Sequence, residues 1–148
     1  MSLNEEVELL RNIPLFANIE PSKLKLLAFT SERMTFQPSD LLCKQGDPGD
    51  SAFVIISGDA EVQVQTPKGP HTVAKLGRNA IVGEIAILCD VPRTASVKAT
   101  TKVESMVISK ELFFRLVLEF PQMAVEIMRE LARRLDATNR QLQALKSA

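Results

Sequence analysis

The stretch Gly83–Val97 reads Gly-Glu-Ile-Ala-Ile-Leu-Cys-Asp-Val-Pro-Arg-Thr-Ala-Ser-Val and is the most informative part of this 148-residue chain. It opens on a glycine and a carboxylate, Gly83 and Glu84, and Arg93 follows just before a run of β-type residues. Glycine lets a ligand oxygen approach backbone N–H groups, and a helix N-terminus favours negative charge. Arginine binds two phosphate oxygens at once, whereas a carboxylate accepts hydrogen bonds from sugar hydroxyls. The stretch therefore predicts a site for a small ligand that carries a phosphate and a sugar.

Short runs rich in Val, Ile and Thr extend around this stretch from Met34 to Ile108, and Gly, Pro and Asp residues separate them. The predicted strands are Arg33–Phe36, Leu41–Lys44, Ala52–Ser57, Ala60–Thr66, Thr72–Leu76, Thr94–Ala99 and Val103–Ile108. The turn Ser57–Asp59 predicts a tight hairpin, and Gln45–Asp50 is a second glycine-containing turn. Regular short strands between such turns favour a β-sandwich or barrel.

Helical patterns precede and follow the β-rich region. Asn4 is expected to cap a short first helix, and Pro21 opens a second one. Ser109 is a good N-cap for a helix over Lys110–Leu118. No Gly or Pro interrupts Gln122–Ser147, so we expect one helix there of ~39 Å at 1.5 Å per residue.

This last helix carries an apolar stripe that extends to its C-terminal end. Its members are spaced three or four residues apart, as in the a/d seam of a coiled coil with one polar member: Met128, Leu131, Leu135, Thr138, Leu142 and Leu145. One interpretation is a helix that packs on its own domain. Because the stripe continues to Leu145, the other interpretation is that its distal half meets a partner, most simply a second copy in a parallel dimer.

Composition argues against several classes of function. The net charge is zero, with 18 basic and 18 acidic residues, so no electrostatic footprint for nucleic acid is present. No apolar run approaches the length of a membrane span, and the N-terminus lacks the pattern of a signal peptide. A single histidine, His71, is too few for a β-barrel metalloenzyme, so no metal site is expected. Cys43 and Cys89 lie in apolar runs and fit reduced core thiols in a cytoplasmic protein, with a disulfide as the alternative.

Two linked blocks of the Gly83–Val97 stretch resemble the phosphate-binding cassette of cyclic nucleotide-binding domains. They are Gly83-Glu84-Ile85-Ala86 and Pro92-Arg93-Thr94-Ala95-Ser96-Val97. The resemblance implies an α+β domain over residues 1–148: helices over 4–31, an antiparallel β-roll or jelly roll over 32–108, and helices over 109–147. It implies cAMP as the ligand, with cGMP left open by Thr94, and no further cofactor.

The resemblance also assigns roles to single residues. Glu84 would accept the ribose hydroxyl, Arg93 would bind the phosphate, and the backbone amides of Gly83, Ile85 and Ala86 would line the site. The remaining contacts would come from Thr94 and Ala95. Without ligand, Arg93 would lie beside Glu84, and the two could form an ion pair.

The segment Leu131–Thr138 resembles the dimerisation helix of bacterial cAMP receptor transcription factors. In that family a threonine of this helix binds the adenine amino group, which implies a base contact for Thr138. The next residue in the family is a serine that reaches the nucleotide of the other subunit, and Asn139 departs from it.

No nucleophile–base pair accompanies the cassette, so the implied function is reversible binding that repositions the C-terminal helix, without catalysis. Three classes stay open: a stand-alone sensor that acts on an unidentified effector protein, an excised regulatory domain of a transcription factor, channel or kinase, or a degenerate dimerisation module that no longer binds nucleotide.

Overall fold

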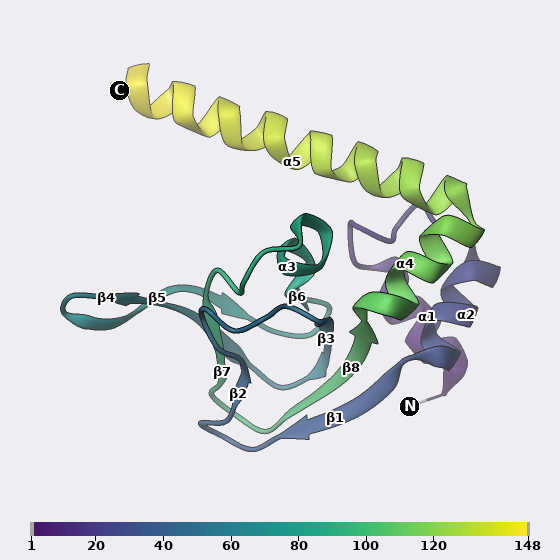
Figure 1. The fold of residues 1–148 in the computed structure, drawn as a ribbon, viewed down its shortest axis with the longest axis horizontal. Coiled ribbons are helices and arrows are strands. Elements are labelled where there is room, and N and C mark those ends of the chain that lie inside the picture. Colours follow the sequence, from purple (N-terminus) through teal and green to yellow (C-terminus); the bar gives the residue numbers. More distant parts are fainter. Residues whose placement is uncertain (1, 148) are drawn as a thin grey trace.

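Two four-stranded antiparallel sheets form the centre of the molecule, and helices pack against the outer face of one of them (Figure 1). The computed structural model describes residues 2–147, apart from the side chains of Ile85 and Ser147. One sheet has the strand order β1-β8-β3-β6 and the other β2-β7-β4-β5. This is the α+β fold that we predicted, as two separate sheets and not as a closed barrel.

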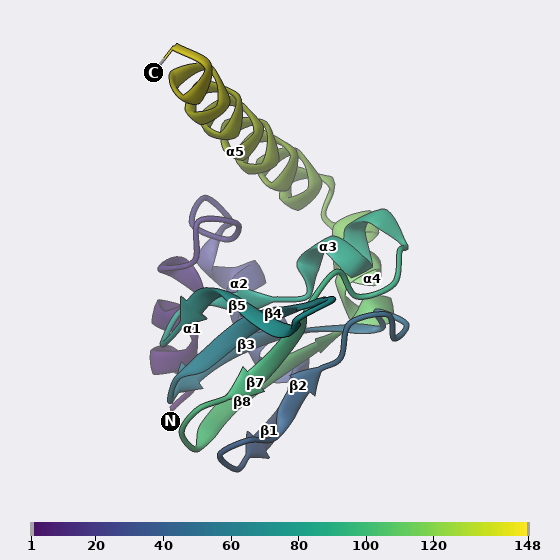
Figure 2. The same ribbon diagram turned by 90° about the vertical axis from the view of Figure 1, so that its left-hand side faces the viewer.

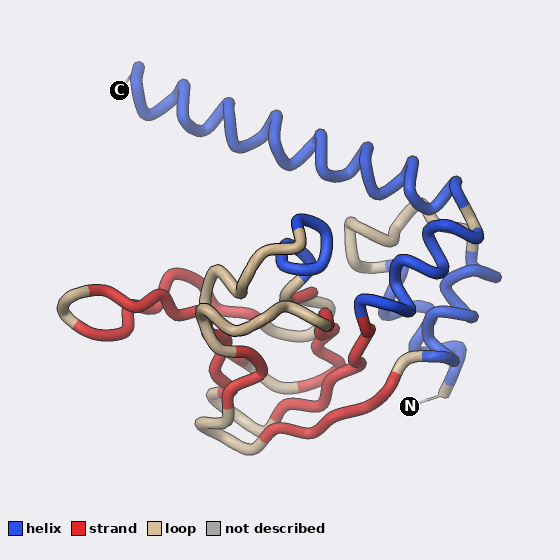
Figure 3. The backbone as a smooth tube through the Cα atoms, in the orientation of Figure 1, coloured by secondary structure: helices blue, strands red, loops and turns tan. Residues whose placement is uncertain are grey.

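The elements follow one another in the order helices, strands, helices (Figure 3). A single short helix, α3, interrupts the strands. The bounds are α1 Leu3–Arg11, α2 Pro21–Thr30, β1 Glu32–Phe36, β2 Leu41–Cys43, β3 Ser51–Ser57, β4 Ala60–Thr66, β5 Gly69–Leu76, β6 Ile81–Val82, α3 Glu84–Cys89, β7 Ser96–Ala99, β8 Val103–Ser109, α4 Lys110–Glu119 and α5 Pro121–Ser147.

Strand β3 is buried on both faces and separates two hydrophobic cores. Because successive side chains of a strand point to opposite faces, Phe53 and Ile55 enter the core between the sheets, whereas Val54 and Ile56 enter the core beneath the helices. An aliphatic run without polar alternation is what such a strand requires. β3 therefore joins the core between the two sheets to the core beneath the helices.

The long helix α5 contributes to the hydrophobic core only through its first turns, and Arg134 adds one polar contact to α3 further along. Met123 and Ile127 are buried in the helix-side core, and Leu131 is partly buried there. Beyond this point the helix extends away from the sheets in both views (Figures 1 and 2). Four members of the apolar stripe are exposed: Met128, Leu135, Leu142 and Leu145.

Several local predictions are confirmed and some are wrong. Ser109 caps α4 by accepting a hydrogen bond from the Leu112 N–H, as expected. The cap of α1 is Ser2 and not Asn4, because the helix begins one residue before Asn4 and the Ser2 hydroxyl accepts from the Glu5 N–H. Cys89 is exposed at the end of α3 and is not a core thiol, and both cysteines are free.

Two strand boundaries differ from the prediction by two or more residues. β7 begins at Ser96 and not at Thr94, and β5 begins at Gly69 because the β4–β5 turn is tighter than expected. Within residues 2–147, no helix has the length and apolar character needed to cross a membrane.

Candidate functional site

The cassette stretch folds as strand β6, a left-handed glycine, helix α3 and a loop that leads into β7. Gly83 has a φ of 88° and turns the chain from β6 into α3, a conformation that costs glycine little. A methyl group at Gly83 would overlap Nη1 of Arg93. We expected a ligand oxygen to use this space, but in the structure the Arg93 guanidinium occupies it. The absence of a side chain at Gly83 therefore leaves room for the Arg93 guanidinium.

Arg93 is buried, with only 6% of its surface exposed, and its guanidinium donates to backbone carbonyls. Nη2 lies 2.7 Å from the Ser51 oxygen and Nη1 lies 3.4 Å from the Gly83 oxygen. The guanidinium carbon lies 5.7 Å from the centre of the Phe53 ring. Within residues 2–147, Arg93 has no ion pair with a carboxylate. Its positive charge is thus compensated only by the dipoles of two backbone carbonyls and by the Phe53 ring.

The loop between β2 and β3 fixes the backbone of Arg93. The Arg93 N–H donates to the Asp47 carbonyl at 2.8 Å, and the Gly46 N–H donates to the Arg93 carbonyl at 2.9 Å. At the other end of this loop, a methyl group on Gly49 would overlap Cβ of Ala86 in α3. The glycine-containing turn that the sequence indicated therefore packs directly against the cassette.

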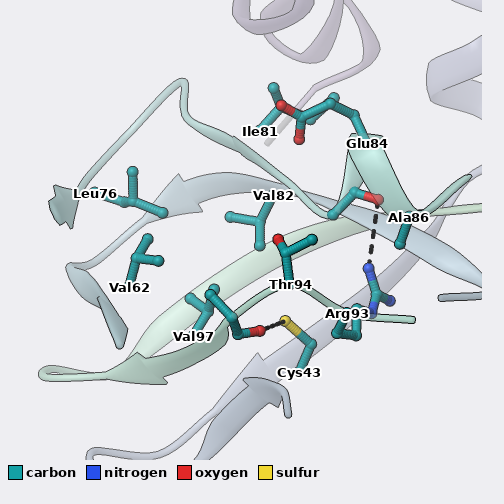
Figure 4. Close-up of a pocket in the computed structure, with 12 residues that line it drawn as sticks. Cys43, Val62, Leu76, Ile81, Val82, Glu84, Ala86, Arg93, Thr94 and Val97 are labelled. Atoms are coloured by element: carbon teal, nitrogen blue, oxygen red, sulfur yellow. Dashed lines mark hydrogen bonds between the residues drawn. The ribbon is translucent and has the colours of Figure 1, made fainter. Parts of the chain in front are cut away.

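A cavity of about 200 Å³ opens beside Arg93, between the cassette and the sheet β2-β7-β4-β5 (Figure 4). One part of its wall is aliphatic and another part carries polar side chains. The lining residues are Cys43, Val62, Leu76, Ile81, Val82, Gly83, Glu84, Ala86, Arg93, Thr94, Ala95 and Val97. The arrangement provides a cation, a carboxylate and an apolar wall around one space.

Glu84 does not form the ion pair with Arg93 that the sequence left open. Its side chain points away from Arg93 (Figure 4), and its Oε1 accepts from Nη1 of Arg134 in α5 at 3.3 Å. The physical reason is that Arg93 is drawn inward to the carbonyls of Ser51 and Gly83, while α5 brings a second arginine to the outer side of α3. This contact joins the cassette to the long helix across fifty positions of sequence.

Cys43 places a thiol in the cavity wall. Its Sγ donates to the Ala95 carbonyl at 3.8 Å. Burial raises the pKa of the Cys43 thiol, and the nearby Arg93 charge opposes that shift without cancelling it. The thiol is therefore a neutral, weakly polar part of the wall at neutral pH.

Six of the eight predicted site residues line this cavity: Gly83, Glu84, Ala86, Arg93, Thr94 and Ala95. Ile85 lies in α3, but its side chain is outside the described part of the chain. Thr138 is exposed on α5 and does not line the cavity formed by residues 2–147. It lies one helical turn after Arg134, and therefore on the same face of α5 as the residue that contacts Glu84.

Sequence reasoning missed Cys43, Val62 and Leu76 in the wall, and it missed Arg134. The strand residues carried no signal of their own, since an aliphatic or thiol side chain in a β-strand is ordinary core. Arg134 had a weak signal, because it lies four residues before Thr138 and so shares its helix face.

Comparison with known proteins assigns the chain to a family. The model of the cyclic nucleotide-binding domain matches residues 33–120, which is more than half of the chain. This protein therefore belongs to the cyclic nucleotide-binding domain family. The matched region contains both sheets except for the first residue of β1, and it includes the whole cavity wall.

Similar proteins include regulators from bacteria and fungi. The CRP-like cAMP-activated global transcriptional regulator of Mycobacterium tuberculosis is 28% identical over 136 residues, covering 91% of this chain and 61% of the regulator. The cAMP-dependent protein kinase regulatory subunit of Colletotrichum orbiculare is 33% identical over 110 residues, covering 74% of this chain and 28% of the subunit. This chain thus spans less than two thirds of the length of either relative.

A solved structure with the same fold is the N-terminal domain of a transcriptional regulator from Streptomyces coelicolor. It superposes with a TM-score of 0.80 at 29% identity, covering 90% of this chain and 94% of that domain. The likeness extends beyond the family match to most of the helices.

Proposed function

We propose that this domain binds a 3′,5′-cyclic nucleotide, cAMP in the first place, and that binding regulates a partner. The observation that carries the proposal is the buried Arg93 guanidinium, which has only carbonyl dipoles and a ring to compensate its charge. A buried cation without a counter-ion is costly, and an anion that reaches it relieves that cost. A cyclic phosphate is such an anion, and Arg93 has donors left for it, since guanidinium carries five N–H groups.

The rest of the cavity fits the rest of a nucleotide. Glu84 is the carboxylate that would accept from the ribose 2′-hydroxyl, and the wall that includes Val62, Leu76 and Val97 would take the apolar face of the base. Thr94 offers a hydroxyl that keeps cGMP as the competing ligand. We propose binding without chemistry, as a regulatory domain, and the mycobacterial and fungal relatives that carry regulatory names support this.

Titration calorimetry tests the function directly. We expect one cAMP site per chain, weaker binding of cGMP, and much weaker binding of 5′-AMP, whose open phosphate carries a second negative charge and lacks the ring that holds phosphate against ribose. Absence of binding heat for both cyclic nucleotides, in protein that unfolds cooperatively, would leave only the degenerate dimerisation module.

We further propose that ligand binding repositions α5. Arg134 ties this helix to Glu84, the carboxylate that the ribose would use, so the ligand and the helix meet at one side chain. A ligand shifts a conformational equilibrium only as far as its affinities for the two states differ. Because Arg134 and the ribose would both use Glu84, the ligand would have different affinities for the states with and without this ion pair.

A homodimer through α5 is the partner arrangement that we propose. Leu135 and Leu142 are 63% and 51% exposed on the apolar stripe, and a second copy of the helix would cover them. We expect light scattering after gel filtration to give a dimer for the wild type and a monomer for Leu142→Glu. Gln141→Glu adds the same charge beside the stripe and should stay dimeric. A monomeric wild type at the concentrations used for calorimetry would contradict the proposal.

The setting of the domain is proposed from its relatives and its cysteines. Because the chain spans 61% of the mycobacterial regulator and 28% of the kinase subunit, the effector is proposed to be a further protein or a further domain. Two free thiols support a reducing, cytoplasmic location.

A further inference from the structure

Arg134 of α5 lies between two carboxylates. Its Nη1 is 3.3 Å from Oε1 of Glu84 in the cassette, and its Nε is 3.8 Å from Oε1 of Glu130 in α5 itself. The three side chains are more than half shielded, with exposed fractions of 37%, 17% and 15% for Arg134, Glu84 and Glu130. The guanidinium is therefore shared between a partner on α3 and a partner on its own helix.

Glu130 is placed to accept the Arg134 guanidinium when it leaves Glu84. Residues four apart on a helix are neighbours, so rotation of the Arg134 side chain alone moves the guanidinium onto Glu130 while the backbone of α5 stays in place. Glu130 already accepts from Arg133 through Oε2 at 3.0 Å, so its Oε1 is the oxygen that faces Arg134. A second acceptor of this kind lowers the cost of removing Arg134 from Glu84.

We propose that Arg134 and Glu130 together set the selectivity of the domain for the ribose hydroxyl. This inference rests on the proposed nucleotide function, because it assumes that Glu84 accepts from the 2′-hydroxyl. Arg134 occupies Oε1 of Glu84 and thereby weakens this carboxylate as an acceptor for the hydroxyl, and Glu130 receives Arg134 when the ribose arrives. The same exchange removes the ion pair between the cassette and α5, so ribose recognition and the loss of this contact are one event.

The test compares cAMP with 2′-deoxy-cAMP, which has the same charge and base but no hydroxyl for Glu84. The ratio of their dissociation constants cancels effects of overall charge on phosphate binding. We expect the wild type to prefer cAMP. In Arg134→Gln the preference should rise about two- to fivefold, the range of a partly exposed ion pair. In Glu130→Gln it should fall by a similar factor, because Arg134 then stays on Glu84.

Matched controls come from the same helix. Arg129 and Glu126 form an ion pair at 2.8 Å within α5, so Arg129→Gln and Glu126→Gln remove the same charges and should leave the preference unchanged. If the wild type binds neither nucleotide, the proposed function fails. If it prefers cAMP but Arg134→Gln keeps or reduces that preference, Arg134 does not compete with the ribose. A rise in Glu130→Gln would overturn the role of Glu130.

Discussion

Arg93→Ala is expected to weaken cAMP binding by about 30- to 1000-fold, which corresponds to roughly 2–4 kcal/mol. The wild-type guanidinium is already buried and oriented by the carbonyls of Ser51 and Gly83, so a phosphate meets a cation that needs little further ordering. Alanine leaves the phosphate in the same cavity without that charge. Titration calorimetry with cAMP measures the loss.

Two further variants separate binding from folding. Arg93→Gln keeps most of the side-chain volume and one set of N–H donors but removes the charge, and it should lose most of the same affinity. Arg78→Ala is the matched control, because Arg78 also donates to a backbone carbonyl, that of Ile56 at 3.0 Å, but lies outside the cavity wall. A Kd within about twofold of wild type for Arg93→Gln, measured on folded protein, would refute the phosphate role.

Gly83→Ala is expected to lower both stability and affinity. The left-handed φ of 88° costs an alanine about 1 kcal/mol, and the new methyl group must displace the Arg93 guanidinium. Because the displaced arginine loses its carbonyl partners, we expect cAMP affinity to fall by at least about tenfold, together with a lower Tm.

Gly69→Ala separates the cost of the left-handed backbone from the displacement of Arg93. Gly69 has a φ of 104°, and a methyl group there would meet nothing within 4 Å, so this variant carries the backbone cost alone. It should lower Tm modestly and keep wild-type affinity. Equal loss of cAMP affinity in the two variants would show that Gly83 has no special relation to Arg93.

Local features of the fold were predictable because short-range chemistry determines them. The Ser109 hydroxyl caps α4, the absence of Gly and Pro over 122–147 gives one long helix, and the glycine turns fall between strands. The cap of α1 was not predictable, since Ser2 and Asn4 are comparable caps and the choice depends on where the helix begins. The two-residue strand β6 is too short to leave a pattern.

The candidate site also has a part that the sequence predicts and a part that only the fold determines. Six cassette residues that line the cavity are close in sequence, so one motif contained them all. The partner of Glu84 was mispredicted, because it depends on the direction in which α5 leaves the domain, and no local pattern encodes that direction. The same holds for Cys43, Val62 and Leu76, which pairing of distant strands brings to the wall.

The part of α5 that follows its last core contact makes this helix a lever with its pivot near Leu131. From there to Ser147 the helix extends about 24 Å at 1.5 Å per residue, so a tilt of about 10° at the pivot moves its end by about 4 Å. A displacement of that size is about three quarters of the ~5.4 Å pitch of a helical turn. A change at the cavity too small to disturb either core would thus be magnified at the C-terminal end into a shift that a neighbouring protein surface can distinguish.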